Sequence, residues 1–249
     1  MQLAGTAAIV TGGTGGLGQV ICRTLAREGV GVVVVYERSR QAAEDLVAEL
    51  ASGGAAAIAI QADVANPADA QRALESALAA FGRVDILIND AAYNQWVPYP
   101  DLEALTPEVW NKMLAINLSG PFQFCRAVAP TMRRQEQGRI VNITSVAGLA
   151  PIGSSIGYAV SKAALIHLTR CLAVALAPHV LVNSVAPGTM EGTRMTANLD
   201  PAYTQRAVQG ALIRHPTAKE DVAEQVLTLL RSDSTTGQTI CVDGGRVFH

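Results

Sequence analysis

Short apolar segments alternate with segments of helical spacing along almost the whole chain. The apolar segments, rich in Val, Ile, Leu and Ala, span residues 6–11, 30–36, 56–61, 84–89, 138–144, 180–185 and 238–242. The helical segments span residues 16–28, 39–51, 67–81, 106–134, 157–177 and 220–230, with a disturbance expected near 120–121. Continuously apolar strands are buried on both faces, as in a parallel sheet covered by helices. The alternation predicts an α/β fold of the Rossmann type, a doubly wound parallel sheet of about seven strands with helices on both faces.

The alternation continues without a linker, a repeat or a low-complexity segment, so we expect residues 1–249 to form a single domain. The stretch 188–216 lacks a strand pattern and is rich in Gly, Pro and Thr. Such stretches often form mobile loops over binding sites, and we expect a mobile excursion of this kind here.

Composition and charge exclude several classes of protein. The formal net charge is −2 and no long block of like charge occurs, so neither nucleic acid nor a membrane surface is an expected partner. The most apolar stretch, 160–179, contains Lys162, His167 and Arg170, and the first residues lead directly into a strand. We therefore expect no transmembrane segment and no signal peptide. Because the cysteines are scattered and the histidines lack metal spacing, the sequence predicts a cytoplasmic protein with reduced thiols and no metal centre.

A glycine-rich turn follows the first expected strand and opens the first expected helix. The turn reads Thr11-Gly12-Gly13-Thr14-Gly15-Gly16-Leu17-Gly18. Glycine lets the backbone turn tightly and leaves no Cβ in the way of an approaching diphosphate. The free N–H groups and the dipole of the following helix attract the same anion. In this strand–turn–helix context the turn predicts a dinucleotide-binding domain.

The end of the second expected strand bears on which dinucleotide binds. Glu37 lies about 20 residues beyond the glycines, where a carboxylate can accept hydrogen bonds from the adenosine ribose. The same carboxylate repels a 2′-phosphate, which favours NAD. Arg38 and Arg40 favour NADP instead, since a guanidinium can hold that phosphate. On charge grounds NAD is the favoured cofactor, and NADP is not excluded.

Three further side chains form a candidate catalytic set. Ser145 follows the strand at 138–144, at the end of the sheet where ligands bind. Tyr158 and Lys162 are four residues apart and so share one helix face. The lysine ammonium and a bound nicotinamide cation are expected to lower the tyrosine pKa and favour the phenolate. The tyrosine can then act as general acid or base on an alcohol or carbonyl, and the serine hydroxyl can hold the substrate oxygen.

These motifs together resemble the short-chain dehydrogenase/reductase family over nearly the whole chain. The matching motifs are the turn Thr11-Gly12-x-x-x-Gly16-x-Gly18, Asp63-Val64, Asn117, the spacing of Ser145, Tyr158 and Lys162, Pro187-Gly188, and Asp243-Gly244-Gly245. The chain departs from the family after the fourth strand, where the usual Asn-Asn-Ala-Gly reads Asn89-Asp90-Ala91-Ala92. A family threonine that reaches the nicotinamide amide corresponds to Thr189 or, one place later than usual, Thr193.

The resemblance implies a catalytic set of Ser145, Tyr158, Lys162 and Asn117, in which Asn117 completes a tetrad with a water relay. It implies a cofactor site of Gly12, Thr14, Gly16, Leu17, Gly18, Glu37, Arg38, Asp63, Val64, Asn89, Ala91, Tyr158, Lys162, Pro187, Gly188 and Thr189. By resemblance we also expect a homo-oligomer, a tetramer or a dimer, with the helices at 106–134 and 157–177 at an interface.

The sequence leaves the substrate open. Side chains expected to line the substrate cleft are Trp96, Tyr99, Leu149, Ile152, Met190 and Met195. The leading hypothesis is an NAD-dependent oxidoreductase acting on a small-molecule alcohol or ketone. An alternative is an NADPH-dependent 3-oxoacyl thioester reductase that uses Arg38 for the 2′-phosphate and Arg126, Arg133 and Arg134 for an acyl carrier protein. A third hypothesis is a dinucleotide-binding regulator without catalysis, suggested by the altered segment 89–92.

Overall fold

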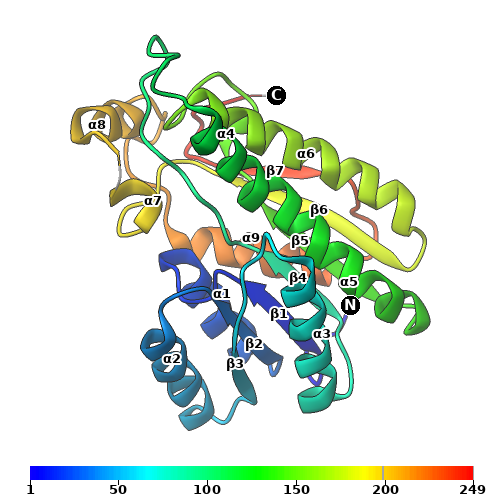
Figure 1. Ribbon diagram of the computed structural model, residues 1–249. Coiled ribbons are helices and arrows are strands. Elements are labelled where there is room, and N and C mark those ends of the chain that lie inside the picture. Colours follow the sequence, from blue (N-terminus) through cyan, green and yellow to red (C-terminus); the bar gives the residue numbers. More distant parts are fainter. Residues whose placement is uncertain (198, 249) are drawn as a thin grey trace.

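The computed structural model describes residues 1–197 and 199–248, and its centre is one parallel sheet (Figure 1). The seven strands lie in the order β3-β2-β1-β4-β5-β6-β7, and every neighbouring pair is parallel. The strands are β1 (Ala7–Thr11), β2 (Gly31–Tyr36), β3 (Ala57–Gln61), β4 (Ile86–Asn89), β5 (Gly138–Ile143), β6 (Val180–Pro187) and β7 (Thr239–Val242). This sheet confirms the predicted Rossmann-type α/β fold.

Helices cover both faces of the sheet. The helices are α1 (Gly16–Arg27), α2 (Arg40–Ser52), α3 (Pro67–Phe81), α4 (Pro107–Leu114), α5 (Gly120–Arg134), α6 (Ile156–Leu176), α7 (Arg194–Ala197), α8 (Pro201–Gln209) and α9 (Lys219–Arg231). Helices α1, α2 and α9 pack into one core cluster, and α3, α5 and α6 pack into a second. Successive residues of β1 belong to different clusters, Ile9 to the second and Val10 to the first. The strands are therefore buried on both faces, as their continuous apolar sequences predict.

The long helix expected over 106–134 is interrupted by a π-helical turn, η1 (Ala115–Ser119), between α4 and α5. Pro121 lies in the first turn of α5 and lacks a backbone N–H, so the regular hydrogen-bond ladder cannot pass through it. Gly120 packs so closely on Val64 that an added Cβ would lie 3.0 Å from a Val64 methyl carbon. The disturbance expected near 120–121 is therefore real, and it places Asn117 inside the π-helical turn.

The strand order changes direction at β1, because the chain builds β2 and β3 on one side and β4 to β7 on the other. At such a switch point the loops beyond the carboxyl ends of β1 and β4 separate and leave a crevice. The described part of the stretch 188–216, residues 188–197 and 199–216, contains no strand and forms the short helices α7 and α8, which lie beside this edge of the sheet (Figure 1).

Helix α6 is the one described helix that is long and apolar enough to cross a membrane, with a hydropathy of 1.5. From the sequence we had expected no transmembrane segment, because the most apolar stretch contains Lys162, His167 and Arg170. The structure resolves this difference: Lys162 and Ser161 are buried in the protein, and α6 packs along β6 and α4. These are the contacts of a core helix.

Candidate active site

The glycine-rich turn is held against the loop that follows β4. The Thr11 hydroxyl accepts hydrogen bonds from the backbone N–H groups of Asp90 (3.1 Å) and Ala91 (3.2 Å). Gly12 has φ +67°, and a Cβ there would lie 2.8 Å from the Ala91 Cα. A Cβ on Gly18 would collide with the Gly12 carbonyl oxygen. The two glycines therefore allow the tight turn and the close approach of α1 to β1, as a dinucleotide-binding turn requires.

A cavity of about 430 Å³ runs from this turn along the carboxyl edge of the sheet. Most residues of the expected cofactor and catalytic sets line it, namely Gly12, Thr14, Gly16, Leu17, Glu37, Arg38, Asp63, Val64, Ala91, Ser145, Tyr158, Lys162, Pro187, Gly188 and Thr189. Glu37 and Asp63 follow β2 and β3, whereas Ser145 and Pro187 belong to the ends of β5 and β6. The cavity is therefore elongated in the way an extended dinucleotide requires, with the glycine cradle in its middle.

Three residues of the expected set, Gly18, Asn89 and Asn117, do not line the cavity. Gly18 lies beneath the turn, close to the Asp90 carboxyl group, where its backbone N–H lowers the pKa of that group. The Asn89 side chain is buried in the sheet and donates to the Asn142 side chain (2.8 Å). The three are thus placed to support the cavity walls.

Asn117 links three parts of the site. Its side chain accepts from the Tyr93 N–H (2.8 Å) and donates to the Tyr93 carbonyl (2.9 Å). It also donates to the Ser161 hydroxyl (3.0 Å), which in turn donates to the Tyr158 carbonyl (2.7 Å). The fully buried amide therefore fixes the loop after β4 to the first turns of α6.

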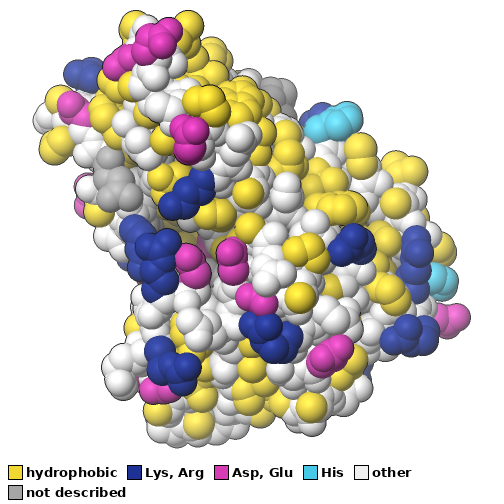
Figure 2. Space-filling model, in the orientation of Figure 1, with side chains coloured by type: hydrophobic (Ala, Val, Ile, Leu, Met, Phe, Trp, Pro, Cys, Tyr) yellow, Lys and Arg dark blue, Asp and Glu magenta, His cyan; other side chains and the backbone are white. Residues whose placement is uncertain are grey.

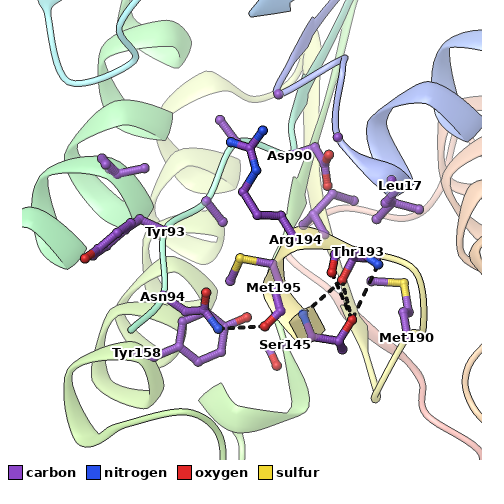
Figure 3. Close-up of a pocket in the computed structure, with 18 of the residues that line it drawn as sticks. Leu17, Asp90, Tyr93, Asn94, Ser145, Tyr158, Met190, Thr193, Arg194 and Met195 are labelled. Carbon is purple, nitrogen blue, oxygen red and sulfur yellow. Dashed lines mark hydrogen bonds between the residues drawn. The ribbon is translucent and has the colours of Figure 1, made fainter. Parts of the chain in front are cut away.

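Ser145 and Tyr158 lie close together at one end of the cavity (Figure 3), and Lys162 lines the same cavity. The Ser145 hydroxyl accepts a hydrogen bond from the Ala147 N–H (3.1 Å), and it lies close enough to Tyr158 to lower the pKa of that residue. The Lys162 ammonium donates to the Ile143 carbonyl at the end of β5 (2.8 Å), and its Nζ lies 5.8 Å from the centre of the Tyr158 ring. The Ser155 hydroxyl caps α6 by accepting from the Tyr158 N–H (3.1 Å), so the tyrosine occupies the first helical turn.

Burial dominates the electrostatics of these groups. It raises the pKa of Tyr158 to about 12, against the lowering effect of the nearby Ser145 hydroxyl, and the Asp90 charge raises it further. It lowers the pKa of Lys162 to about 8, against the opposing effect of Asp90. The expected lowering of the tyrosine pKa is therefore not present in the protein alone, because removal from water disfavours the phenolate.

Asp90 is an acidic group that the sequence had marked only as a departure from the family. Its side chain lies under the glycine-rich turn, where an added Gly18 Cβ would be 3.0 Å from its Oδ2. Complete burial raises the pKa of Asp90 to about 7, while the Lys162 charge and the Gly18 N–H act in the opposite direction. The carboxyl group therefore titrates near neutral pH, within the electrostatic range of Tyr158 and Lys162.

The substrate end of the cavity only partly matches the expected residues. Ile152, Met190 and Met195 line the cavity, but Trp96, Tyr99 and Leu149 do not. Trp96 packs instead on the ring of Tyr203, with ring centres 5.0 Å apart, and the Tyr99 hydroxyl donates to the Ile152 carbonyl (2.7 Å). Trp96 and Tyr99 therefore contact residues that line the cavity, Tyr203 and Ile152, and do not line it themselves.

Other lining residues were not expected from the sequence. They include Tyr93, Asn94, Lys112, Arg194, Leu199, Tyr203 and Arg246. Both threonines that the sequence offered for the nicotinamide amide, Thr189 and Thr193, also line the cavity. The Tyr203 hydroxyl accepts from the Gly153 N–H (2.8 Å), which joins α8 to the loop that precedes α6. No short motif marks these positions, because they come from the loop after β4, from α4, from the stretch 188–216 and from the C-terminal segment, which only the folded chain brings together.

The fold and the site define a class of protein: an α/β oxidoreductase with a dinucleotide cradle and a Ser, Tyr and Lys group at its end. Comparison with known proteins identifies the family. The model of the short chain dehydrogenase family matches residues 6–204, and this chain belongs to that family.

Curated relatives match almost the full length of the chain. The granaticin polyketide synthase "putative ketoacyl reductase 2" of Streptomyces violaceoruber is 42% identical over 240 residues, covering 96% of this chain and 94% of the relative. The 3-oxoacyl-[acyl-carrier-protein] reductase of a Synechocystis species is 37% identical, covering 97% and 96%. A crystal structure of a "putative short-chain dehydrogenase/reductase" from Burkholderia xenovorans superposes with a TM-score of 0.89 at 29% identity, covering 97% of both chains. The chain is therefore an oxidoreductase acting on C=O or CH–OH groups, in a family that uses a nicotinamide cofactor.

Proposed function

We propose that this protein transfers hydride between a nicotinamide cofactor and an alcohol or ketone, with Tyr158 as the general acid and base. The observation that carries the proposal is the convergence of Ser145, Tyr158 and Lys162 at one end of a cavity whose middle is the glycine-rich turn. The bound nicotinamide supplies or accepts the hydride. The protein side chains hold the substrate oxygen and move the proton.

Tyr158 is protonated in the protein alone, because burial raises the pKa of its hydroxyl to about 12. In the reducing direction the Tyr158 hydroxyl gives its proton to the carbonyl oxygen as the C–H bond forms. The O–H bond to the substrate replaces the O–H bond of the tyrosine, and a phenolate remains. In the oxidising direction the phenolate takes the alcohol proton.

Lys162 and Ser145 support this proton transfer. With a pKa lowered to about 8, Lys162 is still mainly an ammonium at neutral pH and stabilises the phenolate. The Ser145 hydroxyl, which lines the cavity near Tyr158, can hold the substrate oxygen. Asn117 serves as a positioning residue for the tetrad, since its side chain bonds Tyr93 and Ser161 and does not reach the cavity.

We favour NAD as the cofactor. Both Glu37 and Arg38 line the far end of the cavity, and the Arg38 guanidinium lies 3.1 Å from the Glu37 carboxylate. The ion pair offsets the arginine charge and leaves the second carboxylate oxygen available for ribose hydroxyls. NADP is the alternative, in which Arg38 turns from Glu37 to the 2′-phosphate. Both side chains are largely exposed, so little else restrains that choice.

A second candidate function is NADPH-dependent reduction of a 3-oxoacyl thioester carried by an acyl carrier protein. The names of the Synechocystis and Streptomyces relatives favour it. The mainly apolar substrate end, with Ile152, Met190 and Met195, suits either a ketone or an acyl chain.

For both functions we propose a cytoplasmic protein that forms a homo-oligomer. The exposed apolar side chains of α5 and α6 form a candidate interface between the subunits.

Turnover of a substrate panel tests the proposal. Purified protein is assayed with NADH and NADPH against aliphatic ketones, aromatic ketones and an acetoacetyl thioester, with oxidation of the cofactor followed by absorbance. Reduction of simple ketones with NADH supports the leading function, and reduction of the thioester with NADPH supports the second. If no carbonyl compound is reduced with either cofactor, the proposed reaction is wrong.

A further inference from the structure

We propose that Arg194, at the start of α7, binds the diphosphate of the dinucleotide from the side opposite the glycine-rich turn. This inference rests on the proposed function, because it assumes that a dinucleotide occupies the cavity. It assigns to the start of α7 a direct part in cofactor binding, beyond the residues Gly188 and Thr189 expected from the sequence.

The backbone before Arg194 is packed on the start of α1. A Cβ on Gly16 would lie 2.6 Å from the Gly192 carbonyl oxygen and 3.3 Å from the Thr193 Cα. Gly192 itself has φ +65°, a conformation that other residues rarely adopt. The segment therefore lies directly over the helix end whose free N–H groups attract the diphosphate.

Hydrogen bonds hold both sides of Arg194. Thr193 is nearly buried, and its hydroxyl accepts from the Thr196 N–H (3.2 Å). On the other side, the buried Asn94 amide donates to the Met195 carbonyl (2.9 Å). The arginine backbone is thus fixed between α1 and the loop after β4, while its side chain is free to reach a ligand.

The Arg194 side chain is directed toward the middle of the cavity. Figure 3 shows it extending away from Tyr158 and Ser145, to the side where Asp90 and Leu17 lie. Among residues 1–197 and 199–248, no hydrogen bond or ion pair involves its guanidinium, although it lines the cavity. An unpaired guanidinium at this place fits a diphosphate, which it can bind through two parallel hydrogen bonds.

Charge balance strengthens the assignment. The turn from Gly12 to Gly18 contains no basic residue, and Asp90 adds an acidic group directly beneath it. Above its pKa of about 7 this carboxyl group repels a bound diphosphate. Arg194 supplies the compensating positive charge from the solvent side. On the face shown in Figure 2, acidic and basic side chains are interspersed and form no large basic surface. A single side chain near the turn, such as Arg194, is therefore the better source of positive charge for the diphosphate.

Cofactor titration of three variants tests the proposal. Wild type, Arg194→Gln and Arg194→Lys are titrated with NADH and, by calorimetry, with ADP-ribose, which has the diphosphate but no nicotinamide. The matched control is Arg206→Gln, an exposed arginine on α8 that does not line the cavity. We expect Arg194→Gln to weaken NADH and ADP-ribose by the same factor, about tenfold, and Arg194→Lys to retain most of the affinity. Arg206→Gln should match wild type, and added salt should weaken wild type more than Arg194→Gln.

The outcomes separate this inference from the proposed function. If wild type binds NADH and Arg194→Gln binds it equally well, the inference is overturned and the proposed function stands. An effect on NADH but not on ADP-ribose, or an effect only on the KM of an acidic substrate, also overturns it, because Arg194 then contacts another group. If wild type binds neither ligand, the proposed function fails first.

Discussion

The Asp90 carboxyl group gives this site an electrostatic property that an asparagine at the same position would not have. Ionised Asp90 raises the pKa of both Tyr158 and Lys162. Because the pKa of Asp90 is itself raised to about 7, its charge appears as the pH rises through neutrality. The protein should therefore keep Tyr158 protonated to a higher pH than the same site with an uncharged residue, which favours carbonyl reduction.

Asp90→Asn tests this property with little change in shape. Alcohol oxidation needs the ionised tyrosine, so its rate rises with pH through the apparent pKa of Tyr158 in the complex. The substitution removes the negative charge that raises this pKa, and the rise should move to lower pH by roughly half a unit to one unit. The pH profile of kcat measures the shift. An unchanged profile, or a shift to higher pH, would show that Asp90 does not act on Tyr158.

Glu37 is expected to decide between the two cofactors. Replacing Glu37 by Gln removes the charge that repels a 2′-phosphate and frees Arg38 from its ion pair. The ratio of NADPH to NADH affinity should increase by about tenfold, and Arg38→Gln should change it in the opposite direction. Fluorescence titration with both cofactors measures the ratio. If the ratio of NADPH to NADH affinity were the same in wild type, Glu37→Gln and Arg38→Gln, neither side chain would reach the ribose.

At the scale of elements, the glycine turn depends on the close approach of α1 to β1. A methyl group on Gly18 would meet the Gly12 carbonyl oxygen and lie 2.9 Å from the Gly13 Cα. We expect Gly18→Ala to destabilise the protein by about 1–3 kcal/mol and to weaken NADH binding, because the turn must open. Thermal unfolding and NADH titration measure both effects.

Gly53→Ala, at the end of α2, is the matched control for this change. Its Cβ would have no neighbour closer than 3.4 Å, so stability and cofactor binding should stay near those of wild type. The interpretation of the turn would be wrong if the two substitutions had equal effects on NADH binding.

The regular elements could be predicted from the sequence, whereas of the irregular ones only the disturbance near 120–121 was expected, and not its form as a π-helical turn. The strands and the helices around them follow from local apolar patterns, so α3 has the expected bounds, 67–81. The π-helical turn at 115–119 depends on Pro121 and on the packing of Gly120 against Val64, which only the folded chain brings together. For the same reason the sequence did not predict α7 and α8, whose positions depend on contacts such as Asn94 with Met195.

In the candidate site, too, some residues could be predicted from the sequence and others could not. Motifs with fixed spacing, such as Tyr158 and Lys162, located the groups to which we assign direct chemical roles. Supporting residues carry no such spacing: Tyr203 reaches the cavity through its bond to Gly153, and Trp96 packs behind it. The raised pKa of Tyr158 could not be predicted from the sequence either, because it depends on how deeply the folded chain buries the hydroxyl group.

At the scale of the whole molecule, helices α5 and α6 lie side by side (Figure 1). Both helices carry apolar side chains that are exposed to solvent. Val174 on α6 is 83% exposed, and Val160, about four turns earlier on the same helix face, is 41% exposed. Phe122 on α5 is also 41% exposed. Exposed apolar residues clustered on two long helices are typical of an interface between subunits.

Val174→Asp should therefore lower the molecular mass in solution from that of an oligomer toward that of a monomer, because a charge would be buried at the interface. Analytical ultracentrifugation measures the change. Leu102→Asp, an equally drastic change in the loop before α4, is the control and should leave the mass unchanged. A wild-type protein that sediments as a monomer would contradict the expected assembly.

The most direct test of the account is the effect of Tyr158→Phe on turnover under conditions where cofactor binding is also measured. Loss of the hydroxyl removes the general acid and base while the ring still fills its place between Ser145 and Lys162. The account predicts that kcat for the best carbonyl substrate falls by about 10²–10⁴ and that NADH affinity changes little. A variant that reduces the substrate at the wild-type rate would contradict the assignment of Tyr158 as the proton donor.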